Sequence, residues 1–162
     1  MSYPDALYLA DKGEVSAVLR AATAAPDLSM FGMTDVHYLA TGASTGGQYG
    51  LYRWEMSDGA PGPAAHFHKT ISEAFYVLDG TVGIYDGETW HDAAPGEFVF
   101  VPPGGIHAFR NAQGPATMLI LFAPGAPREA YFEDLADIIT NGTELTPDEW
   151  TAFYNRHDQY ML

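Results

Sequence analysis

The sequence predicts an all-β fold, a sandwich or barrel of short strands, followed by two short α-helices. Three observations lead to this prediction. Between residues 36 and 122, short apolar segments are separated by turns rich in Gly, Pro and Asp. After Pro124, apolar residues recur at helical spacing. With 47% hydrophobic and 14% aromatic residues, a chain of 162 residues can also bury a sizeable core, which argues against disorder.

Residues 1–35 are expected to form an N-terminal arm before the first clear strand. Within it, Val15 to Ala25 could form either a short Ala-rich helix that Pro26 stops or part of an extended arm. A strand is expected over Val36–Ala40, and the Gly- and Ser-rich segment 41–47 has the composition of a loop. Residues 48–56 then alternate in hydrophobicity, which is typical of a strand with two different faces.

Strands follow in quick succession through the rest of a barrel assigned to residues 36–125. The expected segments are Ala65–His68, Glu73–Leu78, Glu97–Val101, Ile106–Arg110 and Thr117–Phe122. Asp79-Gly80 and Asp86-Gly87 have the composition of tight hairpin turns. The run Pro102-Pro103-Gly104-Gly105 cannot continue a central strand, so it should separate two of these segments.

The last segment, residues 126–162, is predicted to be helical and to pack on the barrel within one domain. Apolar residues at helical spacing predict a first helix over Arg128–Thr140, ended by Asn141-Gly142. A second helix should begin after Thr146, because Thr146 can cap it, Pro147 suits the first helical position and Glu149 completes a capping box.

Composition argues against several classes of partner. The net charge is −14 with only seven Lys and Arg residues, whereas binding to nucleic acid phosphates needs clustered cations. No cysteine is present for disulfides or thiolate chemistry, and no apolar run approaches the length of a membrane span. The first five residues lack the basic and apolar regions of a secretory signal. We therefore expect a cytoplasmic protein with neither a nucleic acid partner nor a membrane partner.

The most informative motif is H-x-H-x4-E, formed by His66, His68 and Glu73, with His107 further along the chain. Side chains alternate along a strand, so His66 and His68 should point to the same side. A carboxylate and a third imidazole can then complete the set of donors. Three nitrogens and one oxygen suit a divalent first-row transition metal and leave positions open for substrate, as in catalytic sites.

These motifs resemble those of the cupin superfamily. The first motif continues from Glu73 to Gly80, and the second is satisfied by Gly96, Pro102, Gly104, His107 and Asn111. One position differs, since the opening glycine of the first motif would fall at Ala60, which affects no proposed ligand. The resemblance implies a double-stranded β-helix, that is, a jelly-roll barrel.

The resemblance also implies a metal site formed by His66, His68, Glu73 and His107. The residue types leave nickel, manganese, iron, cobalt and zinc open. Glu73 is both a ligand and the candidate catalytic base, because one carboxylate oxygen can accept a proton. The alternative is a cupin that has kept these residues without using them. Structural roles are expected for the other histidines, His37, His91 and His157.

A substrate pocket is expected next to the metal site, and strand alternation selects its candidate residues. These are Phe75, Val77, Phe109, Met118 and Phe122, with Phe98, Phe100 and Ile120 as further candidates. Arg53 is preferred to Arg110 as an anchor for a phenolate or carboxylate, because Arg110 has the wrong parity relative to His107. Such apolar walls favour an aromatic or otherwise hydrophobic substrate over a free sugar.

Three functions are consistent with this sequence. The first is a metal-dependent dioxygenase acting on a flavonol-like or polyketide-like substrate, because the chain resembles small bacterial cupins similar to quercetinases. The second is a non-oxidative cupin, an isomerase or cyclase in the tailoring of an aromatic polyketide. The third is a small-molecule-binding protein without catalysis. The resemblance and the open edges of a sheet also predict a homodimer.

Overall fold

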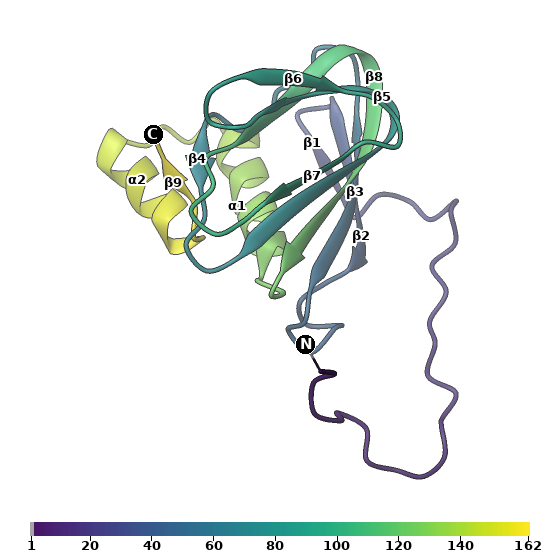
Figure 1. Ribbon diagram of the computed structural model, residues 1–162. Coiled ribbons are helices and arrows are strands. Elements are labelled where there is room, and N and C mark those ends of the chain that lie inside the picture. The colour runs from purple at the N-terminus through teal and green to yellow at the C-terminus, as the bar shows by residue number, and fades with distance from the viewer. Residues whose placement is uncertain (1) are drawn as a thin grey trace.

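The computed structural model describes residues 2–162, and it consists mainly of β-strands, as the sequence predicts (Figure 1). The strands are β1 (Leu28–Met30), β2 (Thr34–Ala40), β3 (Gly50–Met56), β4 (His66–Phe67), β5 (Ser72–Tyr85), β6 (Trp90–Ala93), β7 (Phe98–Val101), β8 (Ala108–Ala123) and β9 (Tyr160–Met161). The helices are α1 (Arg128–Thr140) and α2 (Pro147–Arg156). The prediction of an all-β fold with two short C-terminal helices is confirmed.

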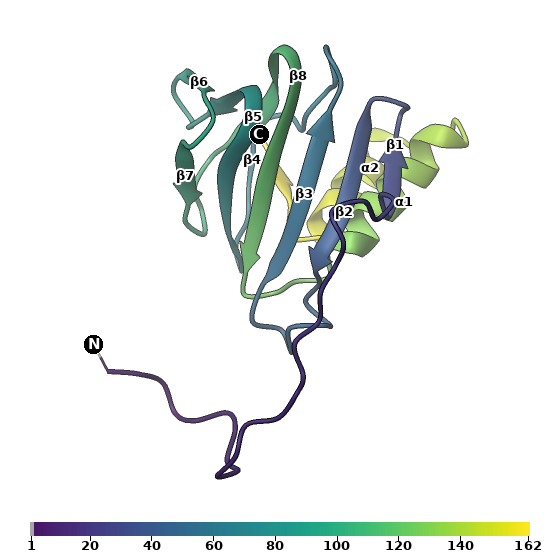
Figure 2. The ribbon, with the colours of Figure 1, turned by 90° about the vertical axis from the view of Figure 1, so that its right-hand side faces the viewer.

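The main sheet has the order β1-β2-β3-β8-β5-β6, with β7 also paired to β5, and all of these pairs are antiparallel. A second, short sheet pairs β4 with β9. Figure 2 shows β2, β3, β8 and β5 side by side, with α1 and α2 behind them. This curved sheet, covered on its concave side by the C-terminal segment, is consistent with the double-stranded β-helix.

Alternating residues of β3 build the core on one face. Tyr52, Trp54 and Met56 are buried, whereas the residues between them are only partly covered. Phe132 of α1 packs edge-on against the rings of Tyr52 and Trp54, with ring centroids 5.4 and 5.1 Å apart. Edge-to-face packing of this kind is favourable for aromatic pairs. Helix α1 therefore closes the same face of the sheet that the alternation of β3 predicts to be buried.

The predicted turn at Asp79-Gly80 is wrong, whereas the turn at Asp86-Gly87 is confirmed. Strand β5 continues through Gly80, where its register with β8 shifts. Gly80 has a φ of +72°, and a Cβ there would lie 2.2 Å from the carbonyl oxygen of Pro115. The dipeptide is therefore an irregularity inside a long strand pair, and two bent strands, β5 and β8, replace the shorter segments expected there.

The predicted orientation of Phe98 and Phe100 is also wrong. Their side chains are 62% and 59% exposed, while Val101 is buried. The sequence of β7, Phe-Val-Phe-Val, is apolar at every position, so its alternation does not reveal which face is inside. Together with Tyr76 on β5, these two phenylalanines leave an apolar surface on the outside of the barrel.

The second helix begins as the sequence predicts. The side chain of Thr146 accepts a hydrogen bond from the Glu149 amide, and the Glu149 side chain accepts one from the Thr146 amide, so the capping box is complete. Asn141 follows the last residue of α1, as expected. After α2, residues 157–159 lead into β9, a strand that the sequence did not predict.

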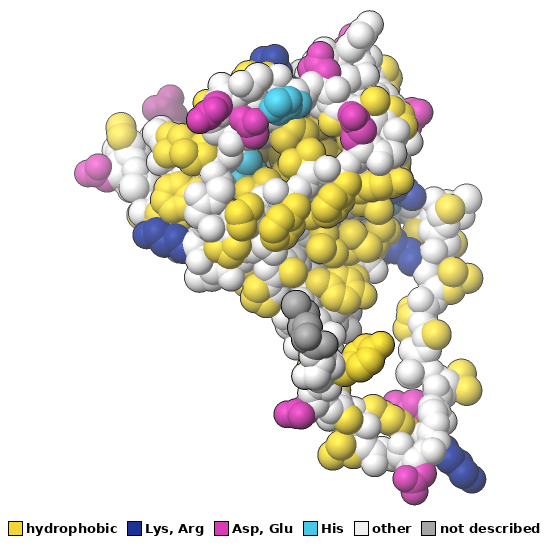
Figure 3. Space-filling view, in the orientation of Figure 1, with side chains coloured by type: hydrophobic (Ala, Val, Ile, Leu, Met, Phe, Trp, Pro, Cys, Tyr) yellow, Lys and Arg dark blue, Asp and Glu magenta, His cyan; other side chains and the backbone are white. Residues whose placement is uncertain are grey.

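Residues 2–27 contain neither helix nor strand, so the helical alternative for Val15 to Ala25 is wrong. Several apolar side chains of this arm are largely exposed, among them Leu7, Leu9, Val15, Val18 and Leu19. Figure 3 shows hydrophobic side chains along this extended arm and on the adjacent face of the barrel. Within the described residues, neither helix has the length and hydrophobicity that crossing a membrane requires.

Candidate metal centre and adjoining cavity

The four residues of the predicted metal site come together inside the barrel. His66 lies on β4, His68 follows it, Glu73 lies on β5 and His107 immediately precedes β8. His66 and His107 are joined by two backbone hydrogen bonds of 3.0 and 2.9 Å. One donor atom from each of the four side chains lies within 4.8 Å of the others, and all four residues are buried.

Backbone carbonyl groups orient all three imidazole rings in the same way. The Nδ1 atoms of His66 and His107 lie 2.8 and 3.0 Å from the carbonyl oxygens of Ala64 and Gly105. Nδ1 of His68 lies 2.5 Å from the carbonyl oxygen of Asp158. A carbonyl oxygen can only accept, so each Nδ1 carries the proton. In a neutral ring, Nε2 then presents its lone pair toward the cluster.

Glu73 supplies the negative charge of the cluster. Its Oε2 lies 3.1 Å from Nε2 of His68 and 2.9 Å from Nε2 of His107. Burial alone would raise the pKa of Glu73, but hydrogen bonds from His107 and His68 outweigh it and hold this pKa below its usual value. Burial opposes the charged form of His107, yet the hydrogen bond and the charge of Glu73 raise its pKa.

His66 differs from its two neighbours because it makes no such pair with Glu73. Burial, together with the nearby His107, lowers the pKa of His66 to about 3, although Glu73 acts in the opposite direction. His66 is therefore a neutral imidazole near pH 7, which is the form that binds metals. Three imidazole nitrogens and one carboxylate, all buried and converging, fit a divalent transition metal, which would displace the Nε2 protons that His68 and His107 donate to Glu73. The four residues can thus hold a metal ion.

Asp158 connects the C-terminal segment to this cluster. Its carboxylate accepts hydrogen bonds from the Lys69 amide at 3.0 Å and from the Thr70 amide and hydroxyl at 2.9 and 2.6 Å. Its carbonyl group accepts the Nδ1 proton of His68. Asp158 has a φ of +53°, a left-handed conformation that Asp tolerates better than most residues. The segment after α2 thereby fixes both the loop that follows His68 and the ring of His68.

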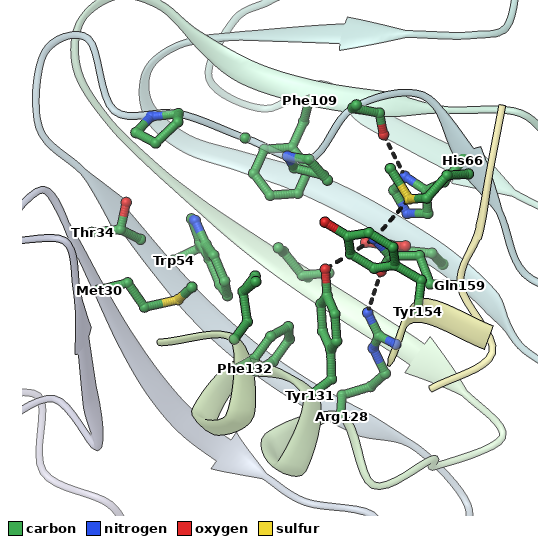
Figure 4. Close-up of a pocket in the computed structure, with 18 of the residues that line it drawn as sticks. Met30, Thr34, Trp54, His66, Phe109, Arg128, Tyr131, Phe132, Tyr154 and Gln159 are labelled. Atoms are coloured by element: carbon green, nitrogen blue, oxygen red, sulfur yellow. Dashed lines mark hydrogen bonds between the residues drawn. The ribbon is translucent and has the colours of Figure 1, made fainter. Parts of the chain in front are cut away.

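A cavity of about 260 Å³ adjoins the cluster (Figure 4). His66 and Glu73 form part of its wall, and aromatic residues from β3, β8 and α1 form much of the rest. Its aromatic lining residues are Phe31, Trp54, Phe109, Phe122, Tyr131, Phe132 and Tyr154. A largely apolar cavity that ends at a few convergent polar groups is the usual form of a small-molecule site.

The predicted pocket residues divide into two groups. Phe109 and Phe122 line the cavity, and so does Ile120. Phe75, Val77 and Met118 are at most 1% exposed and belong to the core. Arg53 does not line the cavity, because its guanidinium contacts Glu55 at 2.7 Å and His37 at 3.1 Å. Strand alternation identifies the inner face, but on that face it does not separate packed core from cavity wall.

The other histidines lie outside the cluster. Each has a neighbouring carboxylate within 4.0 Å: His37 with Glu55, His91 with Asp86 and His157 with Asp134. Arg110 stacks on the ring of Trp90, with its guanidinium 4.1 Å from the ring centroid. Neither that arginine nor these three histidines is among the residues that line the cavity.

Several polar residues of the cavity wall were not predicted from the sequence, among them Arg128, Tyr131 and Gln159. Arg128 donates to the carbonyl oxygen of His157 and to Oε1 of Gln159, at 2.8 and 3.1 Å, and Nε2 of Gln159 donates to the Tyr131 hydroxyl at 2.9 Å. The helical periodicity after Pro127 places Arg128, Tyr131, Phe132 and Leu135 on one face, and this was the available signal. No pattern in the sequence indicated a role for Gln159.

Comparison with known proteins identifies the domain. The family model described as Cupin domain matches residues 52–122, a range that includes all four residues of the cluster. No curated protein matches the chain.

Solved structures with similar folds have low sequence identity to this chain. The polyketide cyclase RemF from Streptomyces resistomycificus is 24% identical, with a TM-score of 0.54, covering 68% of this chain and 80% of that one. Ectoine synthase from P. lautus is 16% identical, with a TM-score of 0.59, covering 74% and 87%. A predicted oxalate decarboxylase from Thermotoga maritima is 19% identical, with a TM-score of 0.58, covering 67% and 99%.

At these identities the structural comparisons establish the fold and leave the reaction open. The matched domain and the shared barrel agree with the two sequence motifs, whose ligand positions converge in one buried cluster. Residues 52–122 therefore match a cupin domain, and the strands of the described residues agree with the double-stranded β-helix of that domain.

Proposed function

We propose that this cupin is a metal-dependent enzyme acting on a hydroxylated aromatic substrate, with dioxygenation of a flavonol-like compound as the first candidate reaction. One observation carries the proposal. The cluster of three histidines and Glu73 forms the polar end of a cavity whose other walls are mostly aromatic. A planar aromatic body suits such walls, and a hydroxyl group could reach the cluster.

His66, His68, Glu73 and His107 would hold one divalent transition metal ion. When bound, this ion supplies Lewis acidity that lowers the pKa of a substrate hydroxyl group. The chain's own contribution is orientation, because carbonyl groups fix the rings of the three histidines through their Nδ1 atoms. The apolar walls exclude water and so favour proton transfer to a protein group.

Glu73 is the proposed base for that proton. Both of its hydrogen bonds to histidine use Oε2, which leaves Oε1 to accept the substrate proton. Because Glu73 also lines the cavity, the proton can pass directly from a bound hydroxyl group. A deprotonated, electron-rich ring is the form of substrate that reacts with dioxygen, which would be the second substrate.

The second candidate is a cyclase or isomerase that uses the same groups without oxygen. The specific observation is the common fold with a polyketide cyclase, RemF, over 68% of this chain. In this reaction Glu73 would move a proton of a carbonyl substrate, and the aromatic walls would hold the folded chain of the polyketide. Oxygen dependence distinguishes the two candidates.

The deciding experiment measures oxygen uptake and loss of flavonol absorbance with protein reconstituted separately with Ni, Mn, Fe, Co and Zn. Metal-dependent consumption of oxygen and flavonol in stoichiometric amounts supports the dioxygenase. His107→Ala should abolish it, whereas His91→Ala, which alters an exposed histidine paired with Asp86, should leave it unchanged. No uptake with any metal contradicts the dioxygenase, and anaerobic turnover of a polyketide substrate would then support the cyclase. Tight binding without any turnover would support the third alternative, a binding protein.

Self-association is a further part of the proposal. Phe98 and Phe100 are exposed on β7, and the apolar residues of the arm have little contact with the domain. We expect a homodimer that covers these surfaces, with the arm of one copy packed on the other. Light scattering coupled to size-exclusion chromatography should give twice the monomer mass, and deletion of residues 2–25 should give the monomer. The expected cytoplasmic location stays a prediction.

A further inference from the structure

We propose that Arg128 binds an anionic group of the substrate, so that the cavity selects aromatic acids over neutral aromatic compounds of the same shape. The inference rests on the proposed function in one respect only, because it takes the cavity to be the substrate site. It adds the charge of the substrate and the residue that recognises it.

Arg128 is buried, and none of the residues that the structure describes offers it a carboxylate partner. Its side chain is 4% exposed, and both of its hydrogen-bond acceptors, the carbonyl group of His157 and the side-chain amide of Gln159, are neutral. Within residues 2–162, the arginines in ion pairs are Arg20, Arg53 and Arg156. The Nε atom of Arg128 is also buried with no hydrogen-bond partner among these residues.

A buried cation without a counter-charge is unfavourable, and its neighbours offset only part of the cost. The guanidinium lies 4.3 Å from the ring centroid of Tyr131 and 5.0 Å from that of Phe122, so aromatic faces contribute some attraction. The carboxylate that acts on it most is Glu73. The Oε2 atom of Glu73 already accepts from two histidines. Metal binding would not remove the mismatch, because a divalent ion exceeds the single negative charge of Glu73.

The position of Arg128 matches a role in binding. Arg128, Glu73 and His66 all line one cavity, so a single ligand can contact the guanidinium and the cluster together. In Figure 4, Arg128 and Tyr131 rise from α1 on one side of the cavity, while Trp54 lies at its other end. The Nε1 atom of Trp54 is likewise buried, with no acceptor in the described part of the chain. Of these two unpaired donors, Arg128 carries the charge and therefore selects for an acid.

The test uses a matched pair of probes, 3-hydroxy-2-naphthoate and its neutral amide, titrated calorimetrically into the full chain after removal of metal with a chelator. Without metal, the carboxylate can gain affinity only from protein groups. We expect the acid to bind on the order of ten- to a hundredfold more tightly than the amide, the usual effect of a charge-assisted hydrogen bond. Equal affinities, or no binding of either probe at millimolar concentration, would overturn the proposal.

Three variants assign the effect to one residue. Arg128→Gln keeps a hydrogen-bonding side chain and removes the charge, so the preference for the acid should disappear. Arg128→Lys keeps the charge and should retain a preference, which preserves the test if the glutamine variant does not fold. Arg110→Gln is the matched control, because Arg110 lies on the surface against Trp90, and it should bind as the wild type does. An unchanged preference in Arg128→Gln would refute the role of Arg128.

These measurements are independent of turnover. A preference for the acid that depends on Arg128 would stand even if no metal supports catalysis. In that case the proposed function would be revised and the proposed anion-binding site would be kept. A dioxygenase or cyclase activity with no preference between acid and amide would instead leave the proposed function in place and remove Arg128 as the anion site.

Discussion

Asp158→Ala is the substitution that best tests how the C-terminal segment supports the candidate metal centre. The carboxylate of Asp158 accepts three hydrogen bonds from Lys69 and Thr70, and its carbonyl group holds the ring of His68. Alanine removes all three hydrogen bonds and tolerates the φ of +53° less well than aspartate does. The change thus loosens the segment without altering any proposed ligand.

The expected magnitude follows from those contacts. Each hydrogen bond to a charged, partly exposed carboxylate contributes about 1 kcal/mol, so three of them contribute about 3 kcal/mol to the free energy of unfolding. Loss of the group that orients a metal-binding histidine typically weakens metal affinity by roughly ten- to a hundredfold. Asp158→Asn should lose less on both measures, because asparagine keeps one acceptor and tolerates the left-handed conformation.

Two assays measure the two effects separately. Urea unfolding of metal-free protein gives the change in stability, and competition with a chromophoric chelator for zinc gives the change in affinity. Asp137→Ala is the matched control, because Asp137 is an exposed aspartate of α1 that lies away from the Asp158 segment, and it should change stability by less than about 0.5 kcal/mol. If Asp158→Ala lost stability but bound zinc as tightly as wild type, Asp158 would not orient His68 and the reasoning would be refuted.

Three further predictions concern single residues. The pKa of His66 in the folded protein is about 3, far below that of the unfolded chain. The stability that neutral His66 contributes is therefore fully present above about pH 6.5 and is lost as the pH falls toward 3. Between pH 7 and pH 5, urea unfolding of metal-free wild type should show a loss of about 2 kcal/mol more than His66→Gln, and equal losses would show that His66 is not a buried neutral imidazole. Gly80→Ala should lower the free energy of unfolding by roughly several kcal/mol, because the new Cβ would lie 2.2 Å from the Pro115 carbonyl oxygen at a positive φ. A melting temperature equal to that of the wild type would contradict the strand irregularity at Gly80. Glu73→Gln should abolish turnover even in preparations whose metal content, measured by mass spectrometry, is partly retained, and activity equal to wild type would exclude Glu73 as the base.

The cluster was predictable because its four residues occupy fixed positions in two short motifs. His66 and His68 share parity on one short segment, and Glu73 and His107 occupy fixed positions of two motifs, so the sequence places four donors in one buried site. The long strands were less predictable. A register shift near Gly80 keeps β5 continuous, and a shift of this kind depends on the partner strand, β8, rather than on local turn chemistry.

The cavity wall was predictable only in part for a related reason. Phe109 and Phe122 face inward by alternation, yet Val77 and Met118 face inward too and are packed completely. Arg128 reaches the cavity because α1 packs across the barrel, which is a long-range contact that periodicity within one helix does not fix. Sequence patterns thus predicted the buried side of β3, β8 and α1, but not that of β7, and they did not predict which residues each buried side contacts.

The two ends of the cavity come from different parts of the chain. The candidate metal ligands all lie between residues 66 and 107, whereas Arg128 and several aromatic rings of the cavity wall lie after residue 127. Under the proposed function, the residues of the reactive centre and those that select the substrate can therefore evolve separately. On that proposal, replacing α1 and α2 with those of another cupin should change the preferred substrate and keep the cluster, provided that the replacement retains an equivalent of Asp158.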